Sequence, residues 1–165
     1  MRHLALTGLA IVALAGPLHS SVAETDPPLA DHVVVDKTAR TITLYAQGRM
    51  LRSFGGIQLG DAPRGHKRFQ GDERTPEGRY VIDWGNPNSS YYLSLHISYP
   101  NANDTAYAAS LGRNAGGMIM IHGQPNGMRS RMRGDWTDGC IALDNAEMEY
   151  VWEVVPDGTV IDILP

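Results

Sequence analysis

The stretch MIMIHGQPNGMRSRMRGDWTDGCIAL, residues 118–143, decides both the fold and the chemistry that the sequence predicts. Its first four residues are apolar and lie between two glycines and His122, which predicts a short central strand. Residues 123–139 are polar and predict a long loop, and residues 140–143 predict a second brief strand. Neighbouring strands would bring His122 and Cys140 together at one edge of a sheet.

Working outward, the remaining apolar patterns predict one mostly-β domain over residues 31–165. Alternating or β-branched runs predict strands at residues 32–35, 41–45, 49–57, 78–84, 92–99 and 159–164. A short helix capped by Asn103 or Asp104 is expected to run to about Leu111. Asp144, with Glu147 three residues later, forms a capping-box pattern that opens a second helix. The 18 glycines and 10 prolines also favour a β-rich fold with many turns.

The N-terminal segment has the composition of a signal peptide. A positive start is followed by an apolar run over residues 4–15, by Gly16-Pro17, and by the small residues of Ser21-Val22-Ala23. We therefore expect residues 1–23 to be cleaved and the protein to be exported to the periplasm or cell envelope, without stable membrane insertion afterwards. An uncleaved N-terminal anchor is the alternative. The formal net charge of −4 gives no reason to expect nucleic acid as a partner.

Cys140 is the only cysteine, so the chain cannot form an internal disulfide. Exported proteins normally use cysteines in pairs, which makes a lone thiol a candidate reactive group. The thiolate is the nucleophilic form, and an imidazole within hydrogen-bond reach can generate it. His122 is the candidate base, and Gly139 allows a tight bend that would turn nearby amides toward an oxyanion. The alternatives are an inert buried thiol, an intermolecular bridge, or a histidine and cysteine that never meet.

A histidine-glycine pair, a long loop and Thr137-Asp138-Gly139-Cys140 together resemble the L,D-transpeptidase catalytic domain family of the YkuD type. Thr75-Pro76-Glu77-Gly78 is similar to a turn of that family. Tyr99-Pro100-Asn101 and Gly134-Asp135-Trp136-Thr137 resemble the branch typified by the murein-lipoprotein amidase. The resemblance covers nearly all of residues 31–165. It implies a mostly-β domain, a β-sandwich of mixed sheets with one or two short helices.

The resemblance also implies roles for individual residues. Cys140 would be the nucleophile and His122 the general acid and base, oriented by the backbone carbonyl of Gly123, with Gly139 in the oxyanion region. No cofactor and no metal are implied. Substrate contacts are expected from the loop before the cysteine, at Arg133, Trp136, Thr137 and Asp138. Stem peptides carry free carboxylates, which a guanidinium binds in a bidentate fork, and Arg133 is the arginine of this loop nearest the motif. Two positions depart from the family pattern: Asp138 stands where most members have histidine, and Ala142 stands where many have arginine or asparagine.

The expected substrates are peptidoglycan stem peptides, joined through a thioester acyl-enzyme. Hydrolysis that releases a peptide or a wall-linked lipoprotein is the close alternative. Each loop residue also has a structural interpretation, since Trp136 can simply pack and a charged loop residue can simply be solvated. Two other classes remain: a zinc enzyme that uses His66, His96 and His122, and a non-catalytic wall-binding module.

Overall fold

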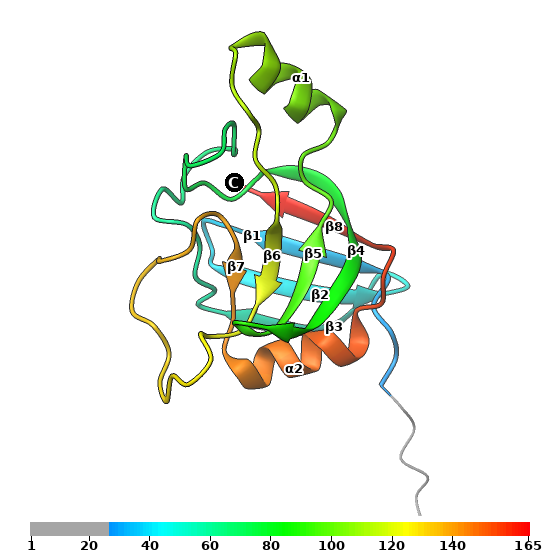
Figure 1. The fold of residues 1–165 in the computed structure, drawn as a ribbon. Coiled ribbons are helices and arrows are strands. Elements are labelled where there is room, and N and C mark those ends of the chain that lie inside the picture. Colours follow the sequence, from blue (N-terminus) through cyan, green and yellow to red (C-terminus); the bar gives the residue numbers. More distant parts are fainter. Residues whose placement is uncertain (1–26) are drawn as a thin grey trace, which may run out of the picture.

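The computed structural model describes residues 27–165 as a curled, mixed sheet of eight strands with two short helices (Figure 1). The strands are β1 (His32–Asp36), β2 (Thr41–Ala46), β3 (Arg49–Gly55), β4 (Gly78–Ser89), β5 (Tyr92–Ile97), β6 (Ile119–His122), β7 (Ile141–Ala142) and β8 (Thr159–Leu164). The helices are α1 (Ala102–Ser110) and α2 (Asn145–Val154). The predicted mostly-β fold with two short helices is confirmed.

All eight strands belong to one hydrogen-bonded sheet, in the order β3-β2-β1-β8-β4-β5-β6-β7. The pairs β1/β8 and β6/β7 are parallel, and the others are antiparallel. Beyond β3, the chain pairs with β7 through two hydrogen bonds between Gln58 and Ala142, of 3.0 and 2.8 Å. This contact brings the two ends of the sheet together. The strands of the predicted sandwich therefore face one another across a single core.

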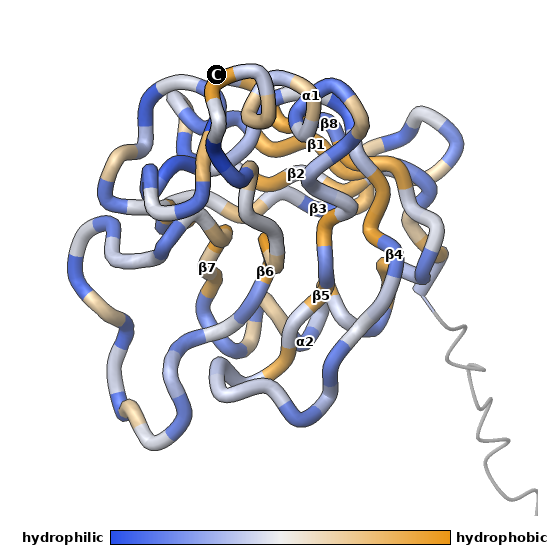
Figure 2. Tube along the Cα trace, turned by 45° about the horizontal axis from the view of Figure 1, so that its top comes forward, coloured by the Kyte–Doolittle hydropathy of each residue, from blue (hydrophilic) through white to orange (hydrophobic). Residues whose placement is uncertain are grey.

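The core lies inside the curl, where the alternating positions of the strands point inward. In β1 and β2 the inward residues are Val33, Val35, Ile42 and Leu44, all fully buried, while their neighbours are partly exposed. In Figure 2 the hydrophobic residues are concentrated on the strands, and the loops around them are largely hydrophilic. β6 differs because all four of its residues are buried, so both of its faces are covered. The strand predicted over residues 118–121 is present one residue later, at 119–122; it is paired on both sides, although only β7 follows it in the strand order.

The helix ends test the predictions from capping residues. The capping box predicted for α2 is confirmed, because α2 begins after Asp144 and the Glu147 carboxylate accepts a 3.1 Å hydrogen bond from the Asp144 amide. The cap predicted for α1, at Asn103 or Asp104, is wrong: Asn101 caps this helix and accepts hydrogen bonds from the amides of Asn103 and Asp104. Asp104 serves instead as the reciprocal acceptor of the Asn101 amide at 3.0 Å. The cap of α1 therefore lies two or three residues before the positions that the sequence predicted, and Asn101 and Asp104 together form a capping box.

The two helices are positioned differently around the sheet. α2 packs against the sheet through Met148, Val151 and Val154, all fully buried. α1 stands apart at one end of the molecule (Figure 1).

Strand β4 is longer than predicted. It was expected to end at Trp84, but with irregularities in its pairing with β5 it continues past Asn86-Pro87 to Ser89.

The predicted signal peptide over residues 1–23 lies outside the described residues. Among residues 27–165, no helix has the length and apolar character needed to cross a membrane.

Candidate active site

The parallel pairing of β6 and β7 places His122 and Cys140 on one face of the sheet. Ile121 pairs with Ile141, and His122 pairs with Ala142. Extending this register by one residue sets Cys140 beside Met120, and the Met120 amide indeed donates to Cys140 Sγ at 3.4 Å. Met120 and His122 share a face because side chains alternate along a strand. Cys140 and His122 are therefore diagonal neighbours on the same face of the sheet.

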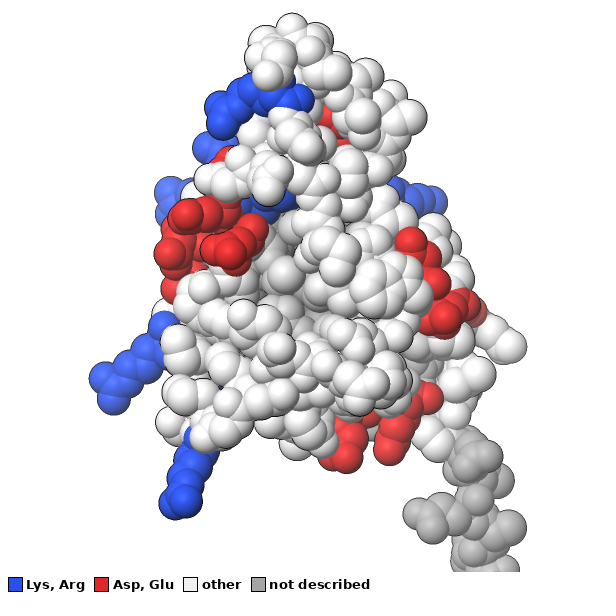
Figure 3. All heavy atoms as spheres, viewed as in Figure 1, with Lys and Arg blue, Asp and Glu red and all other residues white. Residues whose placement is uncertain are grey.

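Both side chains line one cavity of about 650 Å³. Four segments form its walls: the loop before β4, β5 with the turn before it, the residues that lead into β6, and the loop before β7. The lining residues include Lys67, Glu73, Tyr91, Ser94, Met118, Trp136, Thr137 and Asp138. Figure 3 shows the face that carries β6, with a hollowed and largely uncharged centre and a group of acidic side chains to its left. The predicted histidine and cysteine therefore line the same cavity.

A backbone carbonyl fixes the tautomer of His122. Its Nδ1 lies 2.7 Å from the Gly123 carbonyl oxygen, which can only accept a hydrogen bond, so Nδ1 carries the ring proton. Nε2 is then the basic nitrogen. Burial lowers the pKa of His122, against a smaller opposing effect of the Gly123 carbonyl. The ring is therefore neutral at pH 7, as a proton acceptor must be.

Two aromatic rings enclose the imidazole. The ring centroid of Tyr91 lies 4.7 Å from that of His122, and that of Trp136 lies 5.6 Å away, nearly edge-on. His122 is only 3 % exposed. This packing restricts the ring to one orientation, so Trp136 has a packing role beside the cavity that it lines.

Cys140 is held in a mainly protonated resting state. Burial is the main cause that raises its pKa; the negative charge of Asp138 adds to this, whereas the Met120 amide and Lys67 act in the opposite direction. Its Sγ also lies 3.7 Å from the Met118 carbonyl oxygen, to which a thiol can donate. The pair thus rests as a neutral thiol and a neutral imidazole. Proton transfer to Nε2 would then create the nucleophile at the moment of attack.

The loop before Cys140 is fixed by Thr137 and Gly139. The Thr137 hydroxyl donates to the Cys140 carbonyl at 2.8 Å and accepts from the Gly139 amide at 3.2 Å. Gly139 has a φ of +120°, which side chains rarely adopt, and a Cβ there would lie 2.4 Å from the Arg74 carbonyl oxygen. Glycine is therefore required at this position. Because its amide already has a partner in Thr137, the oxyanion role predicted for the Gly139 region stays a prediction.

Gly139→Ala should disrupt this site and lower the free energy of unfolding by about 1–3 kcal/mol. The alanine would have a strained backbone conformation, and its methyl group would also collide with the Arg74 carbonyl oxygen. Gly134→Ala is the matched control. Gly134 also has a positive φ, of +67°, but no atom lies within 4 Å of its added Cβ. Thermal unfolding of both variants measures the difference. Equal melting temperatures would contradict the close contact between Gly139 and Arg74.

Two buried glutamines hold the rest of the long loop. Gln58 donates to the carbonyls of Met132 and Gly134, and Gln124 donates to Gln58 Oε1 and to the Leu143 carbonyl. Arg131 donates to Gly56 and to Asp144 on the same side. The loop is therefore anchored to the sheet near both of its ends. This network was not predicted, because isolated glutamines carry no pattern in the sequence.

The four predicted substrate-contacting residues are placed differently. Trp136, Thr137 and Asp138 line the cavity, and Asp138 is exposed on its wall. Arg133 is exposed and does not line the cavity. The neighbouring Asp135, part of the motif quoted for the amidase branch, pairs with both terminal nitrogens of Arg40 and accepts from the Leu59 amide. Asp135 therefore stabilises the loop.

The other two histidines of the zinc hypothesis have separate partners. His66 Nε2 lies 2.9 Å from Asp104, and His96 Nδ1 lies 2.6 Å from Asp83. Within residues 27–165, no three histidine, cysteine, aspartate or glutamate side chains are grouped so as to hold a metal ion. The geometry of the described part of the chain gives the zinc hypothesis no support.

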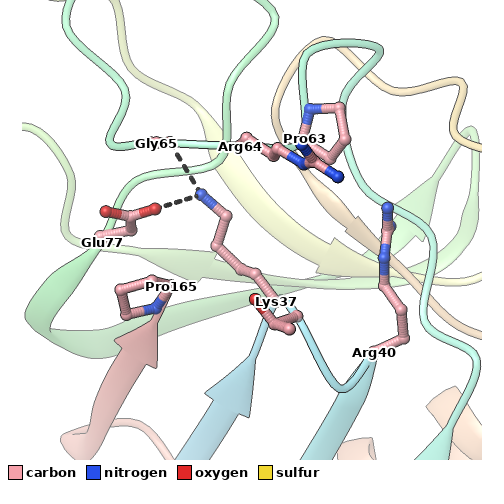
Figure 4. A pocket seen from close by; sticks show the side chains of 8 residues that line it. Lys37, Arg40, Pro63, Arg64, Gly65, Glu77 and Pro165 are labelled. Atoms are coloured by element: carbon pink, nitrogen blue, oxygen red, sulfur yellow. Dashed lines mark hydrogen bonds and ion pairs between the residues drawn. The ribbon is translucent and has the colours of Figure 1, made fainter.

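A smaller cavity of about 430 Å³ lies beside the β1–β2 turn (Figure 4). Its buried cation is Lys37, whose ammonium donates to the Gly65 carbonyl at 2.8 Å, the Thr75 carbonyl at 3.1 Å and Glu77 Oε1 at 2.8 Å. These three acceptors use all of its hydrogens. Lys37 thus fixes the Thr75-Pro76-Glu77-Gly78 turn at the start of β4, which is a structural role.

A curled mixed sheet that presents a histidine and a cysteine from adjacent strands in one cavity defines a mostly-β domain with a cysteine–histidine site. Residues 30–163 match the model of the YkuD family, the L,D-transpeptidase catalytic domain, and the chain belongs to this family. The family resemblance found in the sequence is confirmed.

Individual relatives agree with this assignment. The chain is 29 % identical over 136 residues to YafK of Escherichia coli (strain K12), a candidate L,D-transpeptidase, covering 75 % of this chain and 46 % of YafK. The helical cell shape determining protein Pgp2 of Campylobacter jejuni is 28 % identical, with a TM-score of 0.65 over 86 % of this chain and 51 % of Pgp2. An L,D-transpeptidase from Mycobacterium smegmatis, at 16 % identity, shares the fold, with a TM-score of 0.54 over 82 % of this chain and 59 % of that one. The chain spans about half the length of YafK and Pgp2.

Proposed function

We propose that this protein is an exported acyltransferase that acts on the stem peptides of peptidoglycan through Cys140. The observation that carries the proposal is that Cys140 and His122 line the same cavity, where the Gly123 carbonyl leaves Nε2 of His122 as the basic nitrogen. Membership of the L,D-transpeptidase family supports the substrate class. No cofactor is needed, because the thiol and the imidazole supply the nucleophile and the proton acceptor.

The reaction would proceed in two steps, acylation of Cys140 and transfer of the acyl group to an amine. Nε2 of His122 takes the proton of the Cys140 thiol, and the thiolate attacks the amide carbonyl of a stem peptide. As the carbon–nitrogen bond breaks, the imidazolium returns the proton to the departing amine, and a thioester remains on Cys140. An incoming amine then attacks the thioester and gives its proton to Nε2. The sulfur leaves as a thiolate and recovers that proton.

Hydrolysis by the same site is the second candidate, and Asp138 favours it. Asp138 is exposed on the cavity wall, where its negative charge acts on Cys140. A carboxylate near the thioester would repel an acceptor peptide that carries carboxylates of its own, but it would not repel water. The same cavity would then release a peptide or a wall-linked lipoprotein.

Mass spectrometry of products separates these reactions. The purified protein is incubated with a donor tetrapeptide fragment and, separately, with a lipoprotein-linked tripeptide fragment. Dimers or exchanged products from the first establish transfer, whereas free tripeptide from the second without dimers establishes hydrolysis. If the protein binds wall fragments but forms neither product, it is a non-catalytic wall-binding module.

A role in building the cell wall, and through it in cell shape, follows as part of the proposal. Pgp2, which is 28 % identical to this chain, is a helical cell shape determining protein. We extend that role to this protein because rearranged cross-links alter the shape of a covalent wall. Deletion of the gene should change cell curvature or width, and complementation with a Cys140→Ser copy should not restore it.

Asp138→Asn should make Cys140 more reactive at neutral pH. The charge of Asp138 raises the thiol's pKa, so its removal lowers that pKa and increases the thiolate fraction. Exposed charge interactions contribute about 0.2–1 kcal/mol, which corresponds to at most about a fivefold faster alkylation. The measurement is the rate of iodoacetamide alkylation against pH, at low and high salt, since salt should shrink the difference. Asp157→Asn, in the exposed turn before β8, is the control, and an identical gain there would contradict the local effect.

A further inference from the structure

Lys67 is a buried cation in the wall of the catalytic cavity. It is 3 % exposed and lines the same cavity as Cys140. Its Nζ donates to Asp72 Oδ1 at 2.8 Å and to the Phe69 carbonyl at 3.1 Å. The Asp72 carboxylate in turn accepts from the amides of Arg68, Phe69 and Arg74, so the segment around Lys67 is held firmly.

The ammonium of Lys67 has more donors than partners. An ammonium group has three N–H donors, and the described residues supply acceptors for two of them. This contrasts with Lys37, the other strongly buried lysine, whose three donors are all used. Leaving a buried charged donor without an acceptor is costly, so a ligand oxygen in the cavity would complete the coordination of Lys67.

The positive and negative side chains that line the cavity differ in how deeply they are buried. Lys67 is buried in the wall, whereas Glu73 and Asp138 are exposed on it. The segments that carry these two acids both pass close to Gly60, since a Cβ on Gly60 would lie 2.0 Å from the Glu73 carbonyl oxygen and 2.9 Å from the nitrogen of Gly139, the residue after Asp138. A substrate carboxylate would therefore be repelled at the acidic rim and attracted to the single buried ammonium.

We propose that Lys67 is a specificity-determining residue that binds a free carboxylate on the substrate residue whose carbonyl Cys140 attacks. This inference rests on the proposed function, because it assumes that stem peptides enter this cavity. Lys67, and not Arg133, would then bind the substrate carboxylate, because Arg133 is exposed and does not line the cavity. The N–H of Lys67 left without a partner donates to the carboxylate, while Asp72 and Phe69 keep the ammonium in place.

The test compares two donor tetrapeptides that differ at one group. One has a free side-chain carboxylate on its diaminopimelate residue, and in the other that carboxylate is amidated. A hydrogen bond to a charged group corresponds to roughly a tenfold to hundredfold preference in kcat/KM for the free acid, expressed mainly in KM. Lys67→Met should bring this ratio close to one, and Lys67→Arg should retain part of it.

Asp72→Asn is the matched control. It weakens the same ion pair and lowers stability as Lys67→Met does, but it leaves the ammonium in the cavity. It should keep the preference for the free acid. A purely structural role of Lys67 would give equal losses on both peptides in both variants, and that result would overturn the proposal. A ratio near one in the unmodified protein would overturn it too. If neither peptide is turned over by the unmodified protein, the proposed function itself fails.

Discussion

Cys140→Ser is expected to reduce turnover of stem peptides by on the order of a thousandfold or more. A serine hydroxyl is far harder to ionise than a thiol, and His122 is a weak base because burial lowers its pKa. The transition state would then lack its nucleophile, while substrate binding in the cavity stays nearly intact. Product formation measured by mass spectrometry, with binding measured separately, checks both halves of this expectation.

The fold should tolerate this substitution. Serine is slightly smaller than cysteine, and its hydroxyl can accept from the Met120 amide and donate to the Met118 carbonyl, as the thiol does. Stability should change by no more than about 1 kcal/mol. An active Cys140→Ser protein would refute the cysteine mechanism, whereas an unfolded one would show that Cys140 is needed for packing.

His122→Gln is expected to slow turnover by about 10²–10⁴-fold, the usual contribution of a general acid and base. Glutamine is chosen over alanine because the ring is buried between Tyr91 and Trp136, and alanine would leave a hole there. A glutamine amide can still donate to the Gly123 carbonyl, but it cannot accept a proton from the thiol. Alkylation of Cys140 at neutral pH should slow as well.

The pH profile distinguishes this role from mere packing. Because burial lowers the pKa of His122, the neutral base persists below the ordinary histidine range near 6.5, and kcat/KM should fall only as pH drops through this lowered value. The acid limb should disappear in His122→Gln. His96→Gln serves as the control, since His96 pairs with Asp83 outside the cavity wall and should leave that limb unchanged. An unchanged limb in His122→Gln would show that another group acts as the base.

Local patterns were sufficient to predict most of the fold. The alternation of β1 and β2, the apolar run of β6 and the capping box of α2 follow from the period of each element and the residues at its ends. The same patterns predicted that a strand end would carry His122 and that a following strand would begin at Cys140, one residue before β7 begins. For both side chains to line one cavity, the two strands needed only to be neighbours.

Residues on loops were predicted less well, and Arg133 and Lys67 show why. Both stand in polar stretches without periodicity, and nearness to the Gly139-Cys140 pair in sequence favoured Arg133. The structure leaves Arg133 exposed, whereas it brings Lys67 to the cavity from 73 positions before Cys140. Sequence distance along a loop does not report which side chain turns inward.

The sequence by itself determined the strands, the second helix and the candidate pair of His122 and Cys140, because these depend on interactions within a few residues or on residue chemistry. Tertiary structure alone decided the closure of the sheet at Gln58, the enclosure of His122 by Tyr91, and the burial of the Lys67 ammonium. Each of these joins segments that are distant in the chain. Their positions depend on how the whole core packs, which no local pattern encodes.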